Sequence, residues 1–363
     1  MIKKNVLHLV EYLYLGGIER LLEQLAQATQ SGANLYFFTY ETQTLSGIGK
    51  SIQDQGFPVM TYKKSAGRDW KLFKRLCQVI QENKIEVVHT HDFGPMEYAV
   101  LLKLRFPHLR LIHTQHTMHH FVDKAHYRLF FQAASYFYFQ VIAVSDFVRN
   151  LLLESCPLVN RRALVVIPNG VDTEKFSPQK SFGVLSEKLR LVSISRISKE
   201  KNLDYLFKTC ALLKENDIPF ELHHAGTSKS SEETERIKCY LRDQRIDSEV
   251  TLHGFSDNPA TILARGDIFV SPSAKEGHPV ALLEAMASEK ICLVSDIPPH
   301  RETAQGVLDL FDIQDEKALF NKLKAIYEQN PNFEKMRKDS RALIIKHFSL
   351  NSMAGRYVEL YQQ

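Results

Sequence analysis

The 363-residue sequence lacks the features that mark several protein classes. Its five cysteines are odd in number and widely spaced, without a CxxC pair, so neither a disulfide framework nor a zinc site is indicated and reduced, cytoplasmic thiols are expected. No run of 18 apolar residues occurs, which argues against a transmembrane helix. The opening MIKKNVLHLVEYLYLGG has His8 and Glu11 inside its apolar run, so it predicts a strand and not a signal peptide.

Neither sign of charge dominates, since the formal net charge is only +4. Through Pro178 there are 20 Lys and Arg against 15 Asp and Glu, and the remainder has 26 against 27. The N-terminal half is therefore the basic one. This suits an anionic partner or a membrane surface, although an ordinary solvated surface explains so small a surplus better. No nucleic-acid partner is expected.

Short apolar runs alternate with segments of helical periodicity along the whole chain. NVLHLVEY and NLYFFTY predict strands around the helix IERLLEQLAQATQ, and the pattern restarts at LRLVSISR after the polar stretch DTEKFSPQKSFGVLSEK. Such alternation predicts parallel sheets covered on both faces. We therefore expect an α/β chain with two doubly wound domains, 1–178 and 179–348, and a closing helix within 349–363.

Residues that directly follow strands are the candidates for chemistry, because open α/β sheets bind ligands at the carboxyl ends of their strands. Gly16 and Gly17 follow the first strand and open a helix, whose N–H groups favour an anion, although paired glycines also occur in plain turns. The GxGxxG fingerprint of dinucleotide-binding proteins is absent at this turn. Arg196 and Lys201 flank the loop after LRLVSIS, where they would either converge on one anion or remain solvated.

The stretch KEGHPVALLEAMA places Glu276 and Glu284 eight positions apart around Pro279. Pro279 is expected at the first helical position, with the N–H groups of the following residues facing an anion. The carboxylates would flank that anion and accept hydrogen bonds from sugar hydroxyls. The plain alternative is a solvated loop charge and a wet helix face. A diphosphate between Arg196, Lys201 and the helix start, with a sugar on each side, would use every one of these groups.

Histidines gather in the first half of the chain, at positions 89, 91, 113, 116, 119 and 120. Alternation along a strand is expected to place neighbouring positions on opposite sheet faces, and no acidic cluster accompanies them. The chain also has no DxD, the usual carboxylate pair for a metal–diphosphate. We therefore expect no metal site, and a single functional histidine, His116.

In this order and spacing, these segments resemble the group-1 glycosyltransferases, retaining enzymes of GT-B fold that form family four of the sequence classification. LGGIERLLEQLA is similar to their first glycine loop and helix, SRISKEKNLDYL to their Arg/Lys diphosphate loop, and EGHPVALLEAMA to their Glu-x7-Glu motif. FSLNSMAGRYVELY is similar to the closing helix that crosses back to the first domain. The resemblance covers nearly the whole chain. It implies two facing Rossmann-like domains with an interdomain cleft, the first binding the acceptor and the second the donor.

The resemblance also implies catalytic roles for individual residues. Glu284 would bind the nucleotide's ribose and Glu276 the hydroxyls of the donor hexose. Arg196 and Lys201 would neutralise the departing diphosphate. His116 would sit near the anomeric carbon. The mechanism would be front-face displacement, with no metal and no cofactor.

Four further positions complete the implied donor site. The backbone around His278 and Val280 would finish the phosphate cradle, and Gly16 and Gly17 would lie close to the phosphate or the acceptor. The chain departs from the family pattern at His278 and Pro279, where relatives often have a glycine or an aromatic residue. Because proline removes one N–H from the cradle, the identity of the donor sugar stays open.

The implied reaction is transfer of a hexosyl or N-acetylhexosaminyl group from a nucleotide sugar, UDP first, to a glycan or lipid-linked glycan. The setting would be cell-surface polysaccharide or lipopolysaccharide synthesis in the cytoplasm, with peripheral contact at the inner face of the plasma membrane. A GT-B nucleotide-sugar epimerase and a noncatalytic sugar-nucleotide binding protein are the alternatives. An NAD-linked dehydrogenase is disfavoured by the missing glycine fingerprint.

Overall fold

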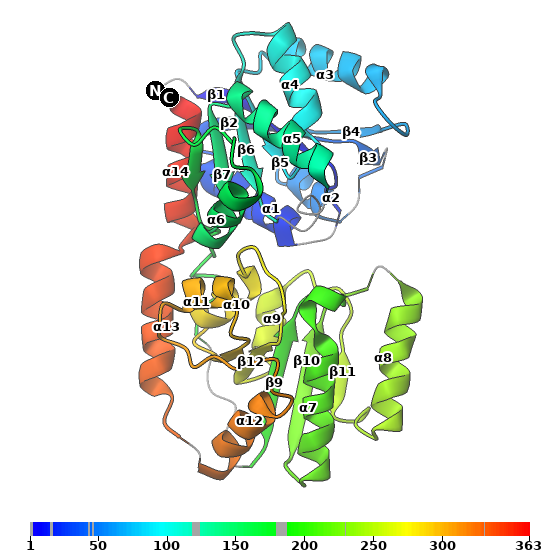
Figure 1. Cartoon of the computed structure of the whole chain (residues 1–363), viewed down its shortest axis with the longest axis vertical. Coiled ribbons are helices and arrows are strands. Elements are labelled where there is room, and N and C mark those ends of the chain that lie inside the picture. The colour runs from blue at the N-terminus through cyan, green and yellow to red at the C-terminus, as the bar shows by residue number, and fades with distance from the viewer. Residues whose placement is uncertain are drawn as a thin grey trace. The chain divides into compact units, whose positions relative to one another are not determined.

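The computed structural model describes residues 3–14, 17–42, 44–45, 47–117, 124–178, 187–228, 230–329 and 331–363. The chain forms two compact units, each built on its own sheet (Figure 1). Unit 1 comprises Met1–Gly170 with Leu350–Gln363, and unit 2 comprises Val171–Ser349. The sequence had placed the boundary at residue 178.

Unit 1 contains an eight-stranded sheet in the order β3-β4-β2-β1-β5-β6-β7-β8. All neighbouring strands are parallel except β3, which pairs antiparallel with β4 at one edge. The strands are β1 (Lys4–Val10), β2 (Ala33–Thr39), β3 (Glu41–Thr42), β4 (Val59–Lys63), β5 (Val87–His91), β6 (Arg110–Gln115), β7 (Gln140–Ala143) and β8 (Leu164–Val166). Helices cover both faces, so β5 is buried along its whole length.

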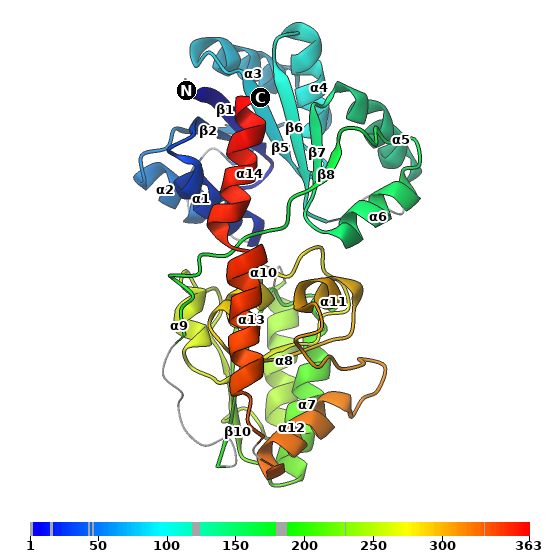
Figure 2. The same ribbon diagram turned by 90° about the vertical axis from the view of Figure 1, so that its left-hand side faces the viewer.

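The helices of unit 1 fall on the two sides of this sheet. They are α1 (Gly17–Thr29), α2 (Gly47–Asp54), α3 (Trp70–Glu82), α4 (Met96–Arg105), α5 (Ala125–Ala134), the 3₁₀ turn η1 (Ser135–Phe137), α6 (Asp146–Ser155) and α14 (Leu350–Gln362). One core joins α3, α4, α5 and α6 to the sheet, and the other joins α1, α2 and α14. Figure 2 shows α14, the last helix of the chain, lying beside α1.

Side-chain caps fix where two of these helices begin. Asp69 accepts hydrogen bonds from the amides of Lys71 and Leu72 at the start of α3. Ser145 accepts from the amide of Val148 at the start of α6. Both satisfy amides that have no acceptor inside the helix.

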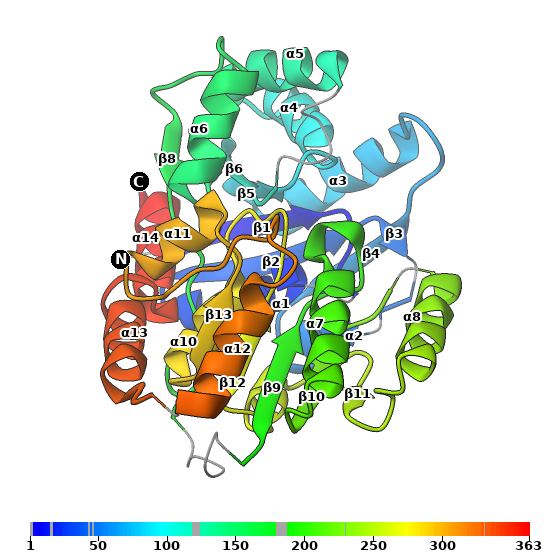
Figure 3. The same ribbon diagram turned by 60° about the horizontal axis from the view of Figure 1, so that its bottom comes forward.

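Unit 2 contains a five-stranded, wholly parallel sheet in the order β11-β10-β9-β12-β13. Its strands are β9 (Leu189–Ile194), β10 (Phe220–Ala225), β11 (Val250–Leu252), β12 (Ile268–Ser271) and β13 (Ile291–Val294). Its helical elements are η2 (Lys199–Lys201), α7 (Leu203–Glu215), α8 (Ser231–Asp243), α9 (Pro259–Leu263), α10 (Val280–Ala287), α11 (Pro298–Ala304), α12 (Ala318–Gln329) and α13 (Glu334–His347). Figure 3 shows α7 and α12 on one face of this sheet, where they share a core, while α10 and α13 pack on the other face.

Each sheet has a point at which its strand order reverses. In unit 1 the reversal lies between β1 and β5, and in unit 2 it lies between β9 and β12. Crevices at the carboxyl ends of strands beside such a reversal are the usual ligand sites of open α/β sheets. The residues that follow β1, β5, β9 and β12 are therefore the candidate site residues.

Candidate active site

The reversal point of unit 2 brings together Lys201 and Glu276, two residues predicted from the sequence. Arg196 follows β9 and is exposed, and Lys201 ends the turn η2. Lys201 Nζ donates to Glu276 Oε1 at 2.5 Å, and the two side chains are 18% and 12% exposed. Burial alone would raise the pKa of Glu276, but the charge and hydrogen bond of Lys201, together with His300 and Ser273, hold that pKa below its usual value. Glu276 is therefore ionised at neutral pH, and the ammonium has two further N–H groups to offer a ligand.

Backbone contacts hold the two loops of this pair in place. The amide of Ala274 donates to the carbonyl of Glu200 at 2.8 Å. Gly226, directly after β10, has a φ of 147°, and a Cβ there would lie 1.7 Å from the carbonyl oxygen of Ser195. Only glycine allows this approach to the loop that carries Arg196. Gly226 was not predicted as a site residue, although its place directly after a predicted strand was a signal.

Helix α10 begins one residue later than the sequence predicted. Pro279 is the N-cap, with φ −81° and ψ 86°, and the first helical residue is Val280. The prediction was wrong because ψ keeps Pro279 outside the helix, although its carbonyl accepts from the amides of Leu282 and Leu283. The amides of Val280 and Ala281 consequently have no acceptor within the helix.

Glu284 and His278, the two side chains predicted at this helix start, are buried and not solvated. Glu284 lies one turn into α10 and is 4% exposed, so it is not on a wet helix face. His278 precedes the helix and is buried. Burial lowers the pKa of His278 to about 4, against the opposing charge of Glu276, so its ring is neutral at physiological pH.

His300, in the first half of α11, is a further residue that the sequence analysis missed. Its Nδ1 lies 2.8 Å from the carbonyl oxygen of Ser295, and the ring feels the charges of both Glu276 and Lys201. Burial lowers its pKa, so the ring is neutral beside the ion pair. The signal was again position, because His300 closely follows the strand β13.

The candidate residues of unit 1 lie after β1, β5 and β6. Helix α1 begins at Gly17, while Gly16 falls outside the described residues. His116 follows β6 and is 7% exposed, and its amide donates to Asp92 Oδ1 at 3.3 Å. Asp92 directly follows β5 with a φ of 55°, and it was not among the residues predicted from the sequence.

Burial raises the pKa of Asp92 to about 7. The His116 amide opposes this, and the carboxylates of Glu19 and Glu11 add to it. Asp92 therefore exchanges its proton in the physiological range, next to the backbone of the predicted functional histidine.

The expectation that sheet alternation separates the histidines was wrong. His89 and His91 are two residues apart and share one face of β5, and His8 on β1 pairs in register with His89. One ring nitrogen from each of these three residues lies within 4.8 Å of the other two. His113 does lie on the opposite face, where it bonds to Thr90 at 2.9 Å. His119 and His120 lie outside the described residues.

Comparisons with known proteins cover almost the entire chain. Residues 175–343 match the family model described as Glycosyl transferases group 1, and residues 15–175 match that of Glycosyltransferase Family 4. The UDP-Gal:alpha-D-GlcNAc-diphosphoundecaprenol alpha-1,3-galactosyltransferase of Escherichia coli is 23% identical, over 99% of this chain and 97% of its own. The GDP-mannose:cellobiosyl-diphosphopolyprenol alpha-mannosyltransferase of Xanthomonas oryzae pv. oryzae is 25% identical, over 98% and 96%.

Solved structures agree on the fold. A glycosyltransferase from Rickettsia africae superposes with a TM-score of 0.83 at 20% identity and covers 99% of this chain and 98% of its own. HepE of Anabaena, in complex with UDP and glucose, gives a TM-score of 0.83 at 15% identity over 99% of both chains. The chain therefore belongs to the group-1, family-four glycosyltransferases, and it is a glycosyltransferase of GT-B fold.

Proposed function

We propose that this glycosyltransferase moves a hexosyl or N-acetylhexosaminyl group from a UDP-sugar to a lipid-linked glycan, with retention of configuration and without a metal. The observation that carries the proposal is the ion pair of Lys201 and Glu276 at the strand reversal of unit 2. Lys201 belongs to the loop after β9 and Glu276 to the loop after β12, so the pair occupies the place where open sheets bind nucleotides. Arg196 lies on the same loop as Lys201.

The donor's diphosphate would bind beside this pair. Lys201 and Arg196 supply the positive charge that stabilises a departing nucleoside diphosphate, and the free amides of Val280 and Ala281 add the helix dipole. Glu276 and Glu284, as buried carboxylates, accept from sugar hydroxyls on either side.

The acceptor and the stereochemistry are proposed from the relatives. The two named above act on glycans linked to diphosphoundecaprenol or diphosphopolyprenol and form α-linkages. UDP-galactose and GDP-mannose are themselves α-linked, so α-products mean retention. We extend both properties to this chain, together with a place in cell-surface polysaccharide synthesis at the cytoplasmic face of the membrane.

The proposal is tested by transfer from radiolabelled UDP-hexoses and UDP-N-acetylhexosamines to a polyprenyl diphosphate that carries one N-acetylhexosamine. One donor should give a lipid-extractable product whose new anomeric proton has the α coupling constant, and the rate should be unchanged by EDTA. Release of free sugar without an acceptor would instead indicate the epimerase. If none of the donors is turned over but UDP binds tightly, the result would indicate the noncatalytic binding protein.

A surface on unit 1 supports contact with a membrane. No helix in the described parts of the chain is long and apolar enough to cross a bilayer. However, the segment 103–162 contains eight Lys and Arg against three Asp and Glu, and its described residues also expose six large apolar side chains. These are Leu104, Leu129, Tyr136, Phe137, Phe139 and Leu158, between 38% and 67% exposed.

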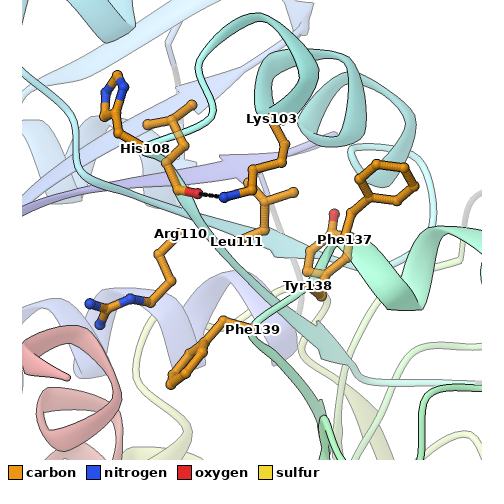
Figure 4. Close-up of a pocket in the computed structure, with 8 residues that line it drawn as sticks. Lys103, His108, Arg110, Leu111, Phe137, Tyr138 and Phe139 are labelled. Carbon is orange, nitrogen blue, oxygen red and sulfur yellow. Dashed lines mark hydrogen bonds between the residues drawn. The ribbon is translucent and has the colours of Figure 1, made fainter.

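Some of these side chains border a basic hollow of about 300 Å³ (Figure 4). Lys103, Arg110 and Phe139 are among its lining residues, and the Arg110 guanidinium lies 5.0 Å from the centre of the Phe139 ring. Lys103 is anchored by the carbonyls of Pro107 and Leu109. Aromatic rings beside fixed cations suit the headgroup layer of an anionic bilayer. We call the six exposed apolar side chains and the basic hollow together the apolar–basic surface.

Vesicle flotation tests this surface. The double variant Leu129→Ser/Phe137→Ser should lose roughly thirtyfold in binding to phosphatidylglycerol vesicles, because each of the two removed side chains contributes about 1 kcal/mol of burial in the headgroup layer. Ile345→Ser, which removes an exposed apolar side chain from unit 2, is the matched control and should bind like the wild type. Equal binding by the double variant and the wild type, or self-association through this surface, would contradict the membrane assignment.

A further inference from the structure

The buried histidines of unit 1 form part of a continuous chain of hydrogen bonds that ends at His116. Its inner half lies on the face of β5 that carries His89 and His91. Tyr357 Oη lies 3.2 Å from Thr114 Oγ1, and Thr114 Oγ1 lies 2.8 Å from His89 Nε2. The other ring nitrogen, His89 Nδ1, lies 2.8 Å from Tyr361 Oη. Its outer half continues from Tyr361 Oη to His8 Nε2 at 3.4 Å, from His8 Nδ1 to His91 Nε2 at 3.0 Å, and from His91 Nδ1 to His116 Nε2 at 3.2 Å. Both ring nitrogens of His8, His89 and His91 are therefore used.

Every histidine in this chain is neutral at physiological pH. Burial lowers the pKa of His8 and of His116 to about 3. It also holds the pKa values of His89 and His91 well below the usual value, and the neighbouring histidines add to the effect. A neutral imidazole has one N–H donor and one acceptor nitrogen, and a hydroxyl has one hydrogen to give.

This count restricts the direction of the hydrogen bonds. A histidine that accepts on one side must donate on the other. The Thr114 and Tyr361 hydroxyls could each accept from both sides, but the hydroxyl hydrogen would then have no acceptor among the described residues. Only an arrangement in which all donors point the same way along the chain avoids this loss. If they pointed toward Tyr357, its phenolic hydrogen would be left over in a side chain that is 4% exposed, with no other acceptor among the described residues. A buried donor without an acceptor loses its hydration and gains nothing in return.

The opposite direction leaves no donor wasted. Each hydrogen from Tyr357 onward then finds an acceptor, and His91 Nδ1–H donates to His116 Nε2. The single hydrogen of His116 must then reside on Nδ1, which has no hydrogen-bond partner among the described residues. His116 would thus present an N–H group to a ligand.

We propose that this chain locks His116 as its Nδ1–H tautomer, so that His116 meets the substrate as a hydrogen-bond donor and not as a proton acceptor. Tyr361, His8 and His91 are positioning residues, because they act on the substrate only through His116. The consequence for catalysis rests on the proposed function, whereas the tautomer itself does not. Helix α14 then has a functional role, although it is far from β5 in the sequence. It carries both phenols, Tyr357 and Tyr361, at the buried end of the hydrogen-bonded chain.

A metal ion would use the same side chains differently. Three imidazole lone pairs from His8, His89 and His91 would have to turn toward one point, with nitrogen–metal bonds of about 2.0–2.1 Å for zinc. That would break the His8–His91 bond and release His116 from its partner. Zinc binding and the hydrogen-bonded chain therefore exclude each other, and an experiment can separate them.

The test is nitrogen NMR of the full-length protein labelled with ¹⁵N-histidine at pH 7.5, with His116 assigned by its loss in His116→Gln. We expect a protonated Nδ1 and an unprotonated Nε2 for His116 in the wild type, a result that needs no variant to fold. An Nε2–H signal for His116, or one equivalent of zinc that shifts the His8, His89 and His91 signals, would overturn the inference.

Two phenol deletions provide the matched comparison. Tyr361→Phe removes a hydroxyl from the chain, so His116 should become a mixture of tautomers. Tyr138→Phe removes an equally buried hydroxyl that bonds to Thr90 on the opposite sheet face at 3.1 Å, and it should leave the His116 signals unchanged. Wild-type signals in both variants would remove Tyr361 from its positioning role.

Kinetics then connect the tautomer with transfer. Tyr361→Phe should lower kcat about tenfold, the value of one hydrogen bond, while KM for the nucleotide sugar stays within about twofold because the proposed donor loops lie in unit 2. His116→Asn, whose amide lies near the position of Nδ1, should retain more activity than His116→Gln. An Nδ1–H signal in an enzyme that transfers no sugar would refute the proposed function alone, and an Nε2–H signal in an active enzyme would refute this inference alone.

Discussion

Asp92→Asn should make the stability of unit 1 less dependent on pH. Burial raises the pKa of Asp92 from 3.8 to about 7 in the folded chain, and the unfolded chain returns it to the ordinary value. Between these two values the folded state holds a proton that unfolding releases, so the free energy of unfolding falls as the pH rises. This contribution is complete below about pH 4 and is lost as the pH passes 7.

The magnitude follows from the pKa difference of about three, at ~1.4 kcal/mol for each step of one, which sets an upper limit of ~4 kcal/mol. Asp92 is partly exposed, so we apply about half of this, ~2 kcal/mol, to allow for solvent screening. For a unit of this size ~2 kcal/mol corresponds to a midpoint change of roughly 4–8 °C. Asparagine keeps the acceptor for the His116 amide and has no charge to bury.

The assay is thermal unfolding followed by tryptophan fluorescence, because the single tryptophan, Trp70, lies in unit 1. Asp92→Asn should unfold close to the wild-type temperature at pH 4 and roughly 4–8 °C higher at pH 8.5. Asp69→Asn is the comparison of opposite sign. Three backbone amides hold the pKa of Asp69 at about 2, so its stabilisation is present above pH 4 and this variant should unfold earlier at pH 8.5. A midpoint for Asp92→Asn equal to the wild type at both pH values would refute the reasoning about Asp92.

Two further substitutions test the unit 2 site. Lys201→Ala should slow transfer about a hundredfold, the usual loss for one leaving-group contact, whereas Glu284→Ala should mainly weaken nucleotide binding. Lys199→Ala, on the same turn but exposed, is the control, and near wild-type kinetics for Lys201→Ala in a transfer assay would contradict the assignment. Gly226→Ala should destabilise unit 2 by roughly 2–4 kcal/mol in denaturant unfolding, because its Cβ would collide with the Ser195 carbonyl. Gly355→Ala, in an open position of α14, should change stability by at most about 1 kcal/mol, and a similar result for both glycines would show that the close approach is not rigid.

The alternation of strands and helices was readable from the sequence because each element has its own local signature. A strand covered on both faces is a short apolar run, and a helix shows its buried stripe every three or four residues. The same logic located the site candidates, since Arg196, Lys201 and Glu276 were chosen for following predicted strands. The approach of Lys201 to Glu276 depends on strand order, which places β9 beside β12 and which local patterns do not contain.

Other features of the site required tertiary information. The pairing of Lys201 with Glu276 joins residues 75 positions apart, and the bond between Tyr361 and His89 spans 272 positions. The raised pKa of Asp92 depends on burial by neighbours that its sequence context does not reveal. The grouping of His89 with His91 was different, because their spacing of two was visible and alternation places such residues on the same face.

The measurement that tests the central claim most directly is thermal unfolding with UDP, GDP, ADP and CMP, with and without EDTA, on the wild type and Glu284→Ala. A nucleotide at a hundred times its dissociation constant adds about 2.7 kcal/mol to the free energy of unfolding, which raises the midpoint by several degrees. We expect UDP to stabilise the wild type but not Glu284→Ala, with no effect of EDTA. Equal stabilisation of both proteins, or none by any nucleotide, would contradict a donor site built on α10 and the Lys201–Glu276 pair.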